Sequence, residues 1–336
     1  MLSIYVVLAF VVLLALAFDY INGFHDTANA IAASVSTRAM SPRVAVTMVA
    51  ILNFVGALYS TGVAQTIAKD IVVADQVTTQ VMVAALIGAI FWNLFTWYFG
   101  IPSSSSHAII GGVMGAGIAK AGVGILQIAG IKKIIMALIF SPIIGMGLGF
   151  TVMTILYWIF KDKAPSKVNG RFRRLQILSA AFLAFNHGSN DAQKSMGIIT
   201  LALVAAGMQS TMDVALWVKL SCAMAIAAGT AAGGWRIIRT LGGKIFKIEP
   251  INGFAADLSS SLVIWVATTF PGLHLPVSTT HVVSGSIMGV GSAKRISAVR
   301  WGVAQQMLIA WILTIPSTAL ASAFVYLFLS LFTYIF

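Results

Sequence analysis

Six long apolar stretches constrain the fold of this chain more than any other feature of the sequence. They cover residues 2–18, 44–63, 81–99, 134–160, 214–235 and 301–336. Each is close to or beyond the ~20 residues with which a helix crosses the hydrocarbon core of a membrane. Charged residues make up 9% of the chain, whereas ordinary soluble domains contain about 25%. The sequence therefore predicts an all-α integral membrane protein that is embedded in a lipid bilayer.

The formal net charge of +12 does not indicate a nucleic-acid-binding protein. The basic residues lie in short loops without interleaved aromatic side chains, as in the cytoplasmic loops of membrane proteins. The first apolar stretch lacks the basic segment that opens a signal peptide, so we expect it to remain in the mature protein. Cys222 is the only cysteine, which excludes an intramolecular disulfide and a cysteine-rich metal site.

Two polar motifs, each with an aspartate, interrupt the apolar stretches. Residues 22–29 read Asn-Gly-Phe-His-Asp-Thr-Ala-Asn, and residues 187–194 read His-Gly-Ser-Asn-Asp-Ala-Gln-Lys. Asp191 follows Asp26 by 165 residues. An ionised aspartate at mid-membrane costs at least ~2.5–3.5 kcal/mol, so each acid should face a partner or a hydrated cavity.

Two hydroxyl-rich motifs repeat at nearly the same interval. Residues 101–107 read Ile-Pro-Ser-Ser-Ser-Ser-His, and residues 275–281 read Leu-Pro-Val-Ser-Thr-Thr-His, 174 positions later. One change in loop length accounts for the difference between the two intervals. We therefore predict a duplicated chain, with repeats at residues 1–160 and 175–336 and a linker at residues 161–174.

Loop charges predict that the two repeats are inserted upside-down relative to each other. Residues 38–43 contain two arginines, whereas the equivalent residues 207–213 contain no basic residue. Residues 61–77 mix both signs, whereas the equivalent residues 236–247 contain four basic residues and no acid. Because cytoplasmic loops accumulate Lys and Arg, this opposite bias indicates inverted repeats. The linker contains six basic residues and helix-breaking Pro, Asn and Gly, so it should be a cytoplasmic loop, with both termini outside.

We expect about ten to twelve transmembrane segments, with broken helices or re-entrant hairpins. Lys120, Lys132 and Lys133 would lie on the outer side if residues 102–120 crossed the membrane completely. A hairpin that returns to its own side would change that assignment.

The Asp26 motif is suited to binding a small cation or a proton. Asp26 and Asn29 are three residues apart, so they share one face of a helix and offer hard oxygen ligands. Alternatively, the carboxylate caps a broken helix or pairs with Lys194. His25 either tunes the acid or is its hydrogen-bonding partner.

The hydroxyl-rich motifs resemble the N-termini of half-helices, with a proline pre-set for the first turn. Free backbone N–H groups and hydroxyls at two such ends would together cradle a tetrahedral oxyanion. In the alternative, the hydroxyls bond to carbonyls of their own helix. His107 and His281 are either anion donors or interhelical hydrogen-bonding partners.

All four motifs, in this order, closely resemble the signatures of the inorganic phosphate transporter (PiT) family. The resemblance spans essentially the whole chain and implies inverted repeats with re-entrant hairpins, a homodimer, and import of inorganic phosphate coupled to a cation. It implies no cofactor, no resident metal and no enzymatic activity. The implied residues for the cation or proton are Asp26, Asn29, Asp191 and Asn190. Those for phosphate are Ser104, Ser105, Ser106, Ser278, Thr279, Thr280 and Lys194. Supporting positions are Asn22, His25, His107, His187 and His281.

The second half departs from the Asp-x-x-Asn pattern of sodium-coupled members, because it reads Asp-Ala-Gln-Lys at residues 191–194. This variant resembles the bacterial low-affinity branch, which is proton-coupled and can carry metal-phosphate. A tethered ammonium at Lys194 would replace a sodium ion, so we favour coupling to protons, with Asp26 or Asp191 as the titrating group. We also expect a multi-pass protein of the prokaryotic cytoplasmic membrane. The alternatives are a sulfate permease of the same fold and an intramembrane Ser/His/Asp hydrolase.

Overall fold

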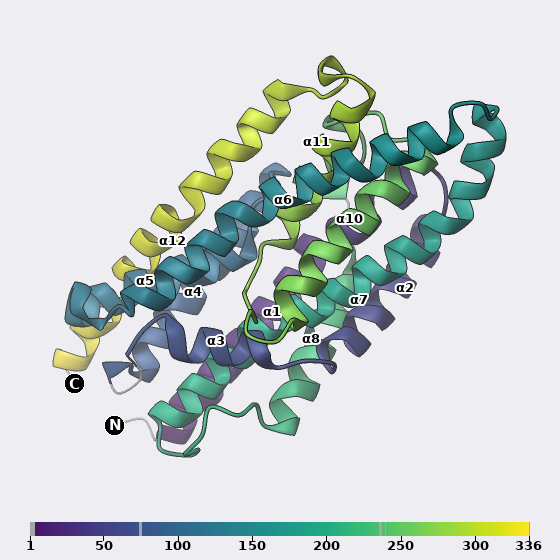
Figure 1. Cartoon of the computed structure of the whole chain (residues 1–336). Helices are drawn as coiled ribbons and strands as arrows, with labels where there is room; N and C mark the ends of the chain where they lie inside the picture. The colour runs from purple at the N-terminus through teal and green to yellow at the C-terminus, as the bar shows by residue number, and fades with distance from the viewer. Residues whose placement is uncertain (1–3, 74–75, 235–236, 239, 336) are drawn as a thin grey trace.

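The structure of the chain is a computed structural model that describes residues 4–73, 76–234, 237–238 and 240–335 (Figure 1). Within these residues the protein is built from helices, and a β-bridge joins Val72 to Leu126. The prediction of an all-α protein is therefore confirmed. The α-helices are α1 (Ile4–Ser36), α2 (Pro42–Ala57), α3 (Gly62–Asp70), α4 (Thr79–Phe99), α5 (Ser105–Ala121), α6 (Ile128–Phe160), α7 (Pro165–Ala205), α8 (Leu216–Ala232), α10 (Pro250–Thr269), α11 (Thr279–Lys294) and α12 (Trp301–Ile335).

Several described helices are long and apolar enough to cross a membrane. Five meet this criterion by themselves, namely α1, α4, α6, α10 and α12. The pair α2 and α3, which is bent by 66°, adds a sixth span if it crosses as one unit. The protein is thus a multi-pass membrane protein, while the number of ten to twelve segments stays a prediction.

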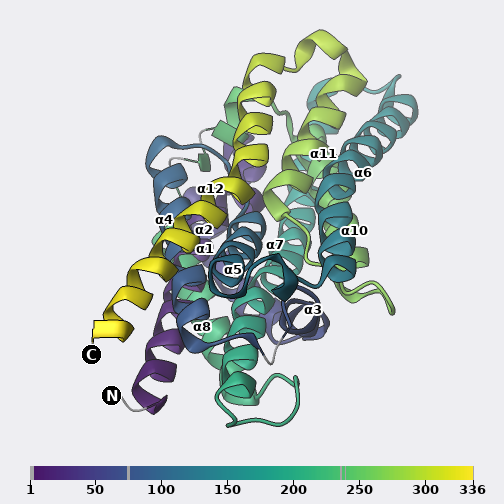
Figure 2. The same cartoon turned by 90° about the vertical axis from the view of Figure 1, so that its left-hand side faces the viewer.

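The bundle has two ends, which both views distinguish. The N- and C-termini lie together at one end, called here the terminal end, and the connection between α6 and α7 lies at the other, the linker end (Figures 1 and 2). Helix α6 runs from the terminal end to the linker end, and α7 runs back. The two halves of the chain therefore meet at the linker end.

Helices α4 and α5 form a hairpin that opens to the terminal end. The Val73 amide donates to the Ile125 carbonyl at 2.9 Å, and the Gln127 amide donates to the Ile71 carbonyl at 3.0 Å. These bonds join the segment before α4 to the segment after α5, so the chain returns to the end from which α4 began. Lys120, near the end of α5, donates to the Gln76 carbonyl beside the start of α4.

Helices α10 and α11 form a second hairpin, which opens to the linker end. The Lys294 ammonium at the end of α11 lies 3.5 Å from the Glu249 carboxylate, which caps α10. Asn169, in the first turns of α7, donates to the same carboxylate at 3.3 Å. The two hairpins therefore open to opposite ends of the bundle, and their tips meet near its centre.

Three predicted loops contain helical segments. Helix α7 begins at Pro165, so residues 165–174 of the predicted linker are helical and only residues 161–164 connect it to α6. A proline at the first helical position starts a helix, because the N–H that it lacks would have had no partner there. Residues 61–77 similarly contain α3. Of the predicted loop at residues 236–247, positions 236 and 239 lie outside the described residues, and Thr240–Lys244 form a π-helical turn.

Glycines allow α7 to pack directly against α2. A Cβ atom at Gly188 would collide with the backbone of Asn53, whereas one at Gly170, also in α7, would meet no atom within 4 Å. We expect Gly188→Ala to lower the free energy of unfolding by about 1–3 kcal/mol through overpacking. Gly170→Ala should raise it by about 0.5–1 kcal/mol, because alanine is the better helix former. Thermal unfolding of both variants in detergent measures the difference, and equal midpoints would contradict the packing argument.

Candidate functional site

Helix α1 places a row of polar side chains on one face. Asp19, Asn22, Asp26 and Asn29 follow one another at intervals of three and four residues, which keeps them on the same side of a helix. All four are at most 3% exposed. The polar row is thus directed into the bundle, as expected for ionisable residues inside a membrane.

Helix α7 brings Asp191 opposite this row. The Lys194 ammonium lies 2.9 Å from Asp191 Oδ1, and Asn190 Nδ2 donates to the same oxygen at 3.1 Å. Asn22 Nδ2 donates to Asp191 Oδ2 at 3.3 Å, and His187 Nε2 lies 3.4 Å from that oxygen. The prediction that Lys194 reaches Asp191 is confirmed, whereas the alternative pairing of Lys194 with Asp26 does not occur.

The hydroxyl-rich motifs cap the N-termini of α5 and α11. Ser104 Oγ accepts from the His107 amide, and Ser278 Oγ accepts from the His281 amide, each at 3.2 Å. The prediction that a proline occupies the first turn is wrong in both motifs, because the serine three residues before each histidine is the cap. The first backbone N–H groups of each helix precede its internal hydrogen-bond ladder and remain able to bind an anion.

Hydroxyl groups from both hairpin tips bind the two aspartates. Ser105 Oγ of α5 donates to Asp26 Oδ2 at 3.1 Å, and Thr280 Oγ1 of α11 donates to Asp26 Oδ1 at 3.2 Å. Thr279 Oγ1 donates to Asp191 Oδ2 at 3.4 Å. One carboxylate of α1 therefore holds both hairpin tips. We call the polar segments that meet here the cradle; they are residues 22–29, 104–106, 187–194 and 278–280.

The other predicted polar residues of the cradle bind the backbone or each other. Asn29 Nδ2 donates to Thr280 Oγ1 at 2.9 Å. Ser106 Oγ and Asn190 Nδ2 both donate to the Val277 carbonyl at 2.9 Å. The alternative that hydroxyls bond only within their own helix is therefore wrong for these motifs. The cradle is closed, since none of its polar side chains is more than 3% exposed.

The predicted histidines fall into two groups. His25 Nδ1 lies 2.7 Å from Asp26 Oδ1, so it is a direct partner of that acid. His107 and His281 instead face one another, with ring centroids 4.5 Å apart, and His281 stacks on Trp311 at 3.9 Å. These two histidines join the hairpins to α12 rather than to a carboxylate.

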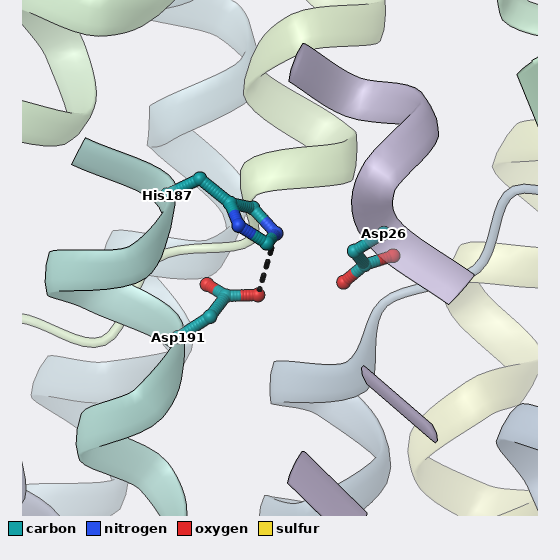
Figure 3. Close-up of side chains that lie close together, drawn as sticks. All are labelled: Asp26, His187 and Asp191. Carbon is teal, nitrogen blue, oxygen red and sulfur yellow. Dashed lines mark ion pairs between the residues drawn. The ribbon is translucent and has the colours of Figure 1, made fainter. Parts of the chain in front are cut away.

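Three of the described side chains are arranged as they would be around a cation. Asp26, His187 and Asp191 each offer one ligand atom, and these atoms lie within 4.8 Å of one another. Figure 3 shows Asp26 on α1 facing His187 and Asp191 on α7. Two carboxylates and one imidazole can bind a small cation or share a proton.

Several polar partners of the site, Asp19, Thr96 and Ser195, lie outside the four motifs. Ser195 Oγ donates to Asp19 Oδ1 at 2.7 Å. Thr96 and Ser103 share a hydrogen bond of 2.7 Å, and Thr96 lies 3.3 Å from His25 Nε2. Asp19 could have been identified in the sequence by its helical spacing from Asn22 and Asp26. Nothing in the local sequence marks Thr96, which depends on how α4 packs against α1.

Comparison with known proteins agrees with the four motifs. A model of the phosphate transporter family matches residues 22–322. A probable low-affinity inorganic phosphate transporter of Bacillus subtilis is 55% identical over 326 residues, which cover 96% of either chain. A protein of the same description from Rhizobium meliloti is 47% identical and covers 93% of either chain. A solved structure described as the sodium-dependent phosphate transporter has a TM-score of 0.90 at 27% identity, covering 97% of this chain and 99% of that one. These matches show that the chain belongs to the phosphate transporter family.

Proposed function

We propose that this protein is a secondary active symporter that imports inorganic phosphate together with a cation. The observation that carries the proposal is the pair of helix N-termini whose hydroxyls converge on two buried aspartates. A helix N-terminus attracts an anion and a buried carboxylate attracts a cation, so one cradle has a place for both. The relatives in this family are transporters and not enzymes, so the hydrolase alternative is set aside.

Phosphate binding is assigned to hydroxyls and backbone N–H groups at the two hairpin tips. The tips comprise Ser104, Ser105, Ser106, Ser278, Thr279 and Thr280, with Lys194 as the nearby positive charge. In the closed cradle, three of these hydroxyls donate to Asp26 or Asp191. A cation or proton on an aspartate would weaken its hold on the hydroxyls and free them for phosphate. Binding of the cation and binding of phosphate would then support each other.

The two halves are proposed to be inverted repeats, residues 1–160 and 175–336. Their hairpins open to opposite ends of the bundle, and their helices pack reciprocally: α1 packs on α8 as α7 packs on α2, and α5 packs on α12 as α11 packs on α6. We place the linker end in the cytoplasm, because residues 161–174 are strongly basic. Both termini would then lie outside the cytoplasmic membrane of a prokaryote. We also propose a homodimer.

Uptake into proteoliposomes tests the function. We expect purified protein to accumulate labelled phosphate when a pH gradient is imposed without sodium. Failure to accumulate phosphate under any proton or sodium gradient would contradict symport. Sulfate at equal concentration should not displace phosphate, because phosphate can donate a hydrogen bond to an aspartate and sulfate cannot. Adding a divalent metal to the same assay tests transport of metal-phosphate.

Proton coupling is favoured over sodium coupling because of Lys194. Its ammonium lies 2.9 Å from Asp191 and supplies the charge that a sodium ion would bring to this position. We expect wild-type uptake to follow the pH gradient, and Lys194→Asn to gain a dependence on sodium. Phosphate uptake by the wild type and by Lys194→Asn should be measured with a pH gradient alone and with a sodium gradient alone. Wild-type uptake that follows sodium and ignores the pH gradient would refute this assignment.

A further inference from the structure

Asp19 is a buried acid for which the proposed function has no role. It lies on the polar face of α1, seven residues before Asp26, and is 0% exposed. Its Oδ1 accepts a hydrogen bond from Ser195 Oγ at 2.7 Å. Its Oδ2 is buried and has no nitrogen or oxygen donor among the described residues, and the neighbouring Cys222 thiol of α8 is only a weak donor. A buried carboxylate normally satisfies both oxygens, so this one is incompletely compensated.

The charged groups near Asp19 come mainly from α7. Lys194 and Asp191 both interact electrostatically with it, and the Cys222 thiol of α8 lies beside it. Helix α4 also packs on α1, but it contains no Asp, Glu, His, Lys or Arg. Two carboxyl groups, Asp19 and Asp191, therefore share the single ammonium of Lys194.

Electrical neutrality of Asp19, Asp191 and Lys194 requires that one of the two acids is protonated. If both acids were ionised, the group of Asp19, Asp191 and Lys194 would carry a net negative charge in the interior of a membrane protein, which is costly. Because Lys194 already pairs with Asp191 at 2.9 Å, Asp19 is the acid without a counter-ion. A proton on Asp19 leaves a neutral acid beside a neutral ion pair.

We propose that Asp19 is a proton-binding site that is coupled to the cradle through Lys194. Loss of its proton would draw the Lys194 ammonium toward Asp19 and weaken the pair with Asp191. Asp191 also accepts the Thr279 hydroxyl at the tip of α11, so the state of Asp19 is transmitted to that hairpin. In each transport cycle the Asp19 carboxylate binds one proton, and the resulting carboxylic acid later releases it, so no other reactant is needed. The inference rests on the proposed symport of phosphate with protons.

Asp19→Asn tests the site because asparagine keeps the shape of a protonated aspartate but cannot release a proton. We expect exchange of internal for external phosphate at equal pH to persist, because exchange needs no net proton movement. Accumulation driven by a pH gradient should fall by at least about tenfold, the size of a typical coupling between two ligands. The rate of exchange should also vary less with pH than in the wild type. Proteoliposomes with labelled phosphate provide all three measurements.

Asp257→Asn is the matched control. Asp257 is another buried acid, 2% exposed on α10, and it accepts a hydrogen bond from a serine of α7, Ser179, at 3.5 Å. Neither Lys194 nor Asp191 is among the groups that act on it. We expect its replacement to change exchange and accumulation in equal proportion. A selective loss of accumulation must therefore be confined to Asp19→Asn.

The possible outcomes separate this inference from the proposed function. If the wild type neither exchanges nor accumulates phosphate, the proposed function fails. If the wild type accumulates phosphate on a pH gradient and Asp19→Asn does so equally well, the role of Asp19 is refuted. Equal loss of exchange and accumulation in folded Asp19→Asn would also refute it, since that result indicates a structural residue. If Asp19→Asn does not fold, Asp19→Glu decides: it should keep accumulation and shift the pH dependence of exchange, and an unchanged pH profile would refute the proposal.

Discussion

Replacing Asp191 with asparagine is expected to abolish phosphate uptake and to destabilise the protein. Asp191 is the counter-ion of Lys194 and also binds Asn22 and Thr279. Asparagine would remove the partner that lies 2.9 Å from the buried ammonium, and breaking a buried pair costs about 3–5 kcal/mol. Asp19, the other nearby acid, would offset part of this cost only by giving up its proton. A loss of this size in the binding-competent state lowers uptake by more than ~100-fold. Initial rates of uptake and thermal unfolding in detergent measure the two effects.

A double variant separates the effect of Asp191→Asn on transport from its effect on stability. In Asp191→Asn with Lys194→Met, no charge is left unpaired, because the ammonium is removed together with the carboxylate. We expect stability to recover toward the wild type while uptake stays abolished. If uptake recovers as well, Asp191 is only the structural partner of Lys194 and takes no part in transport.

Replacing Asp26 with asparagine should also abolish uptake, but at a smaller cost in stability. The Asp26 carboxylate accepts hydroxyl donors from both hairpins, through Ser105 and Thr280. Asparagine keeps one acceptor oxygen and leaves no lysine unpaired, so we expect the free energy of unfolding to fall by about 1–3 kcal/mol. Uptake should fall by at least ~100-fold, because the negative charge that attracts the coupled cation is gone.

An exposed acid provides the control for Asp26. Asp162, in the turn between α6 and α7, is exposed at the linker end of the bundle, and Asp162→Asn should leave uptake within about twofold of the wild type. Binding of phosphate, measured by isothermal calorimetry, distinguishes loss of coupling from loss of the anion site. Asp26→Asn with normal gradient-driven uptake would remove Asp26 from the proposed cation site.

The sequence predicts the polar centre of the protein well, because membrane burial leaves few alternatives for charged groups. Asp191 and Lys194 are three residues apart on one helix, so their contact follows from local geometry. Duplication of the motifs identified both aspartates and both hydroxyl segments. The same reliance on duplication explains why Asp19 was missed: the position 165 residues later is Ala184, so no repeat marks it.

Contacts between distant segments were not predictable in this way. Thr280 binds Asp26 across 254 residues, and no spacing in the sequence specifies which hydroxyl reaches which acid. Pro165 was misread because a proline that starts a helix and one that breaks a helix look alike in sequence. The difference depends on the residues that pack around it. Packing also decides that Ser104 and Ser278 are the N-caps of α5 and α11. The first residue of each short helix depends on how its hairpin tip packs, which the local sequence does not specify.

The attachment of both hairpin tips to one carboxyl group has a consequence for leakage. Because the hairpin of α4 and α5 opens to the terminal end and that of α10 and α11 opens to the linker end, a continuous pore would require both tips to part from Asp26. Each of its two oxygens binds the hydroxyl of one tip. Release of a single hydroxyl would therefore open the entrance at one end of the bundle, while the tip of the other hairpin stays bound to Asp26. Both bonds must therefore break before the two entrances can be open at the same time.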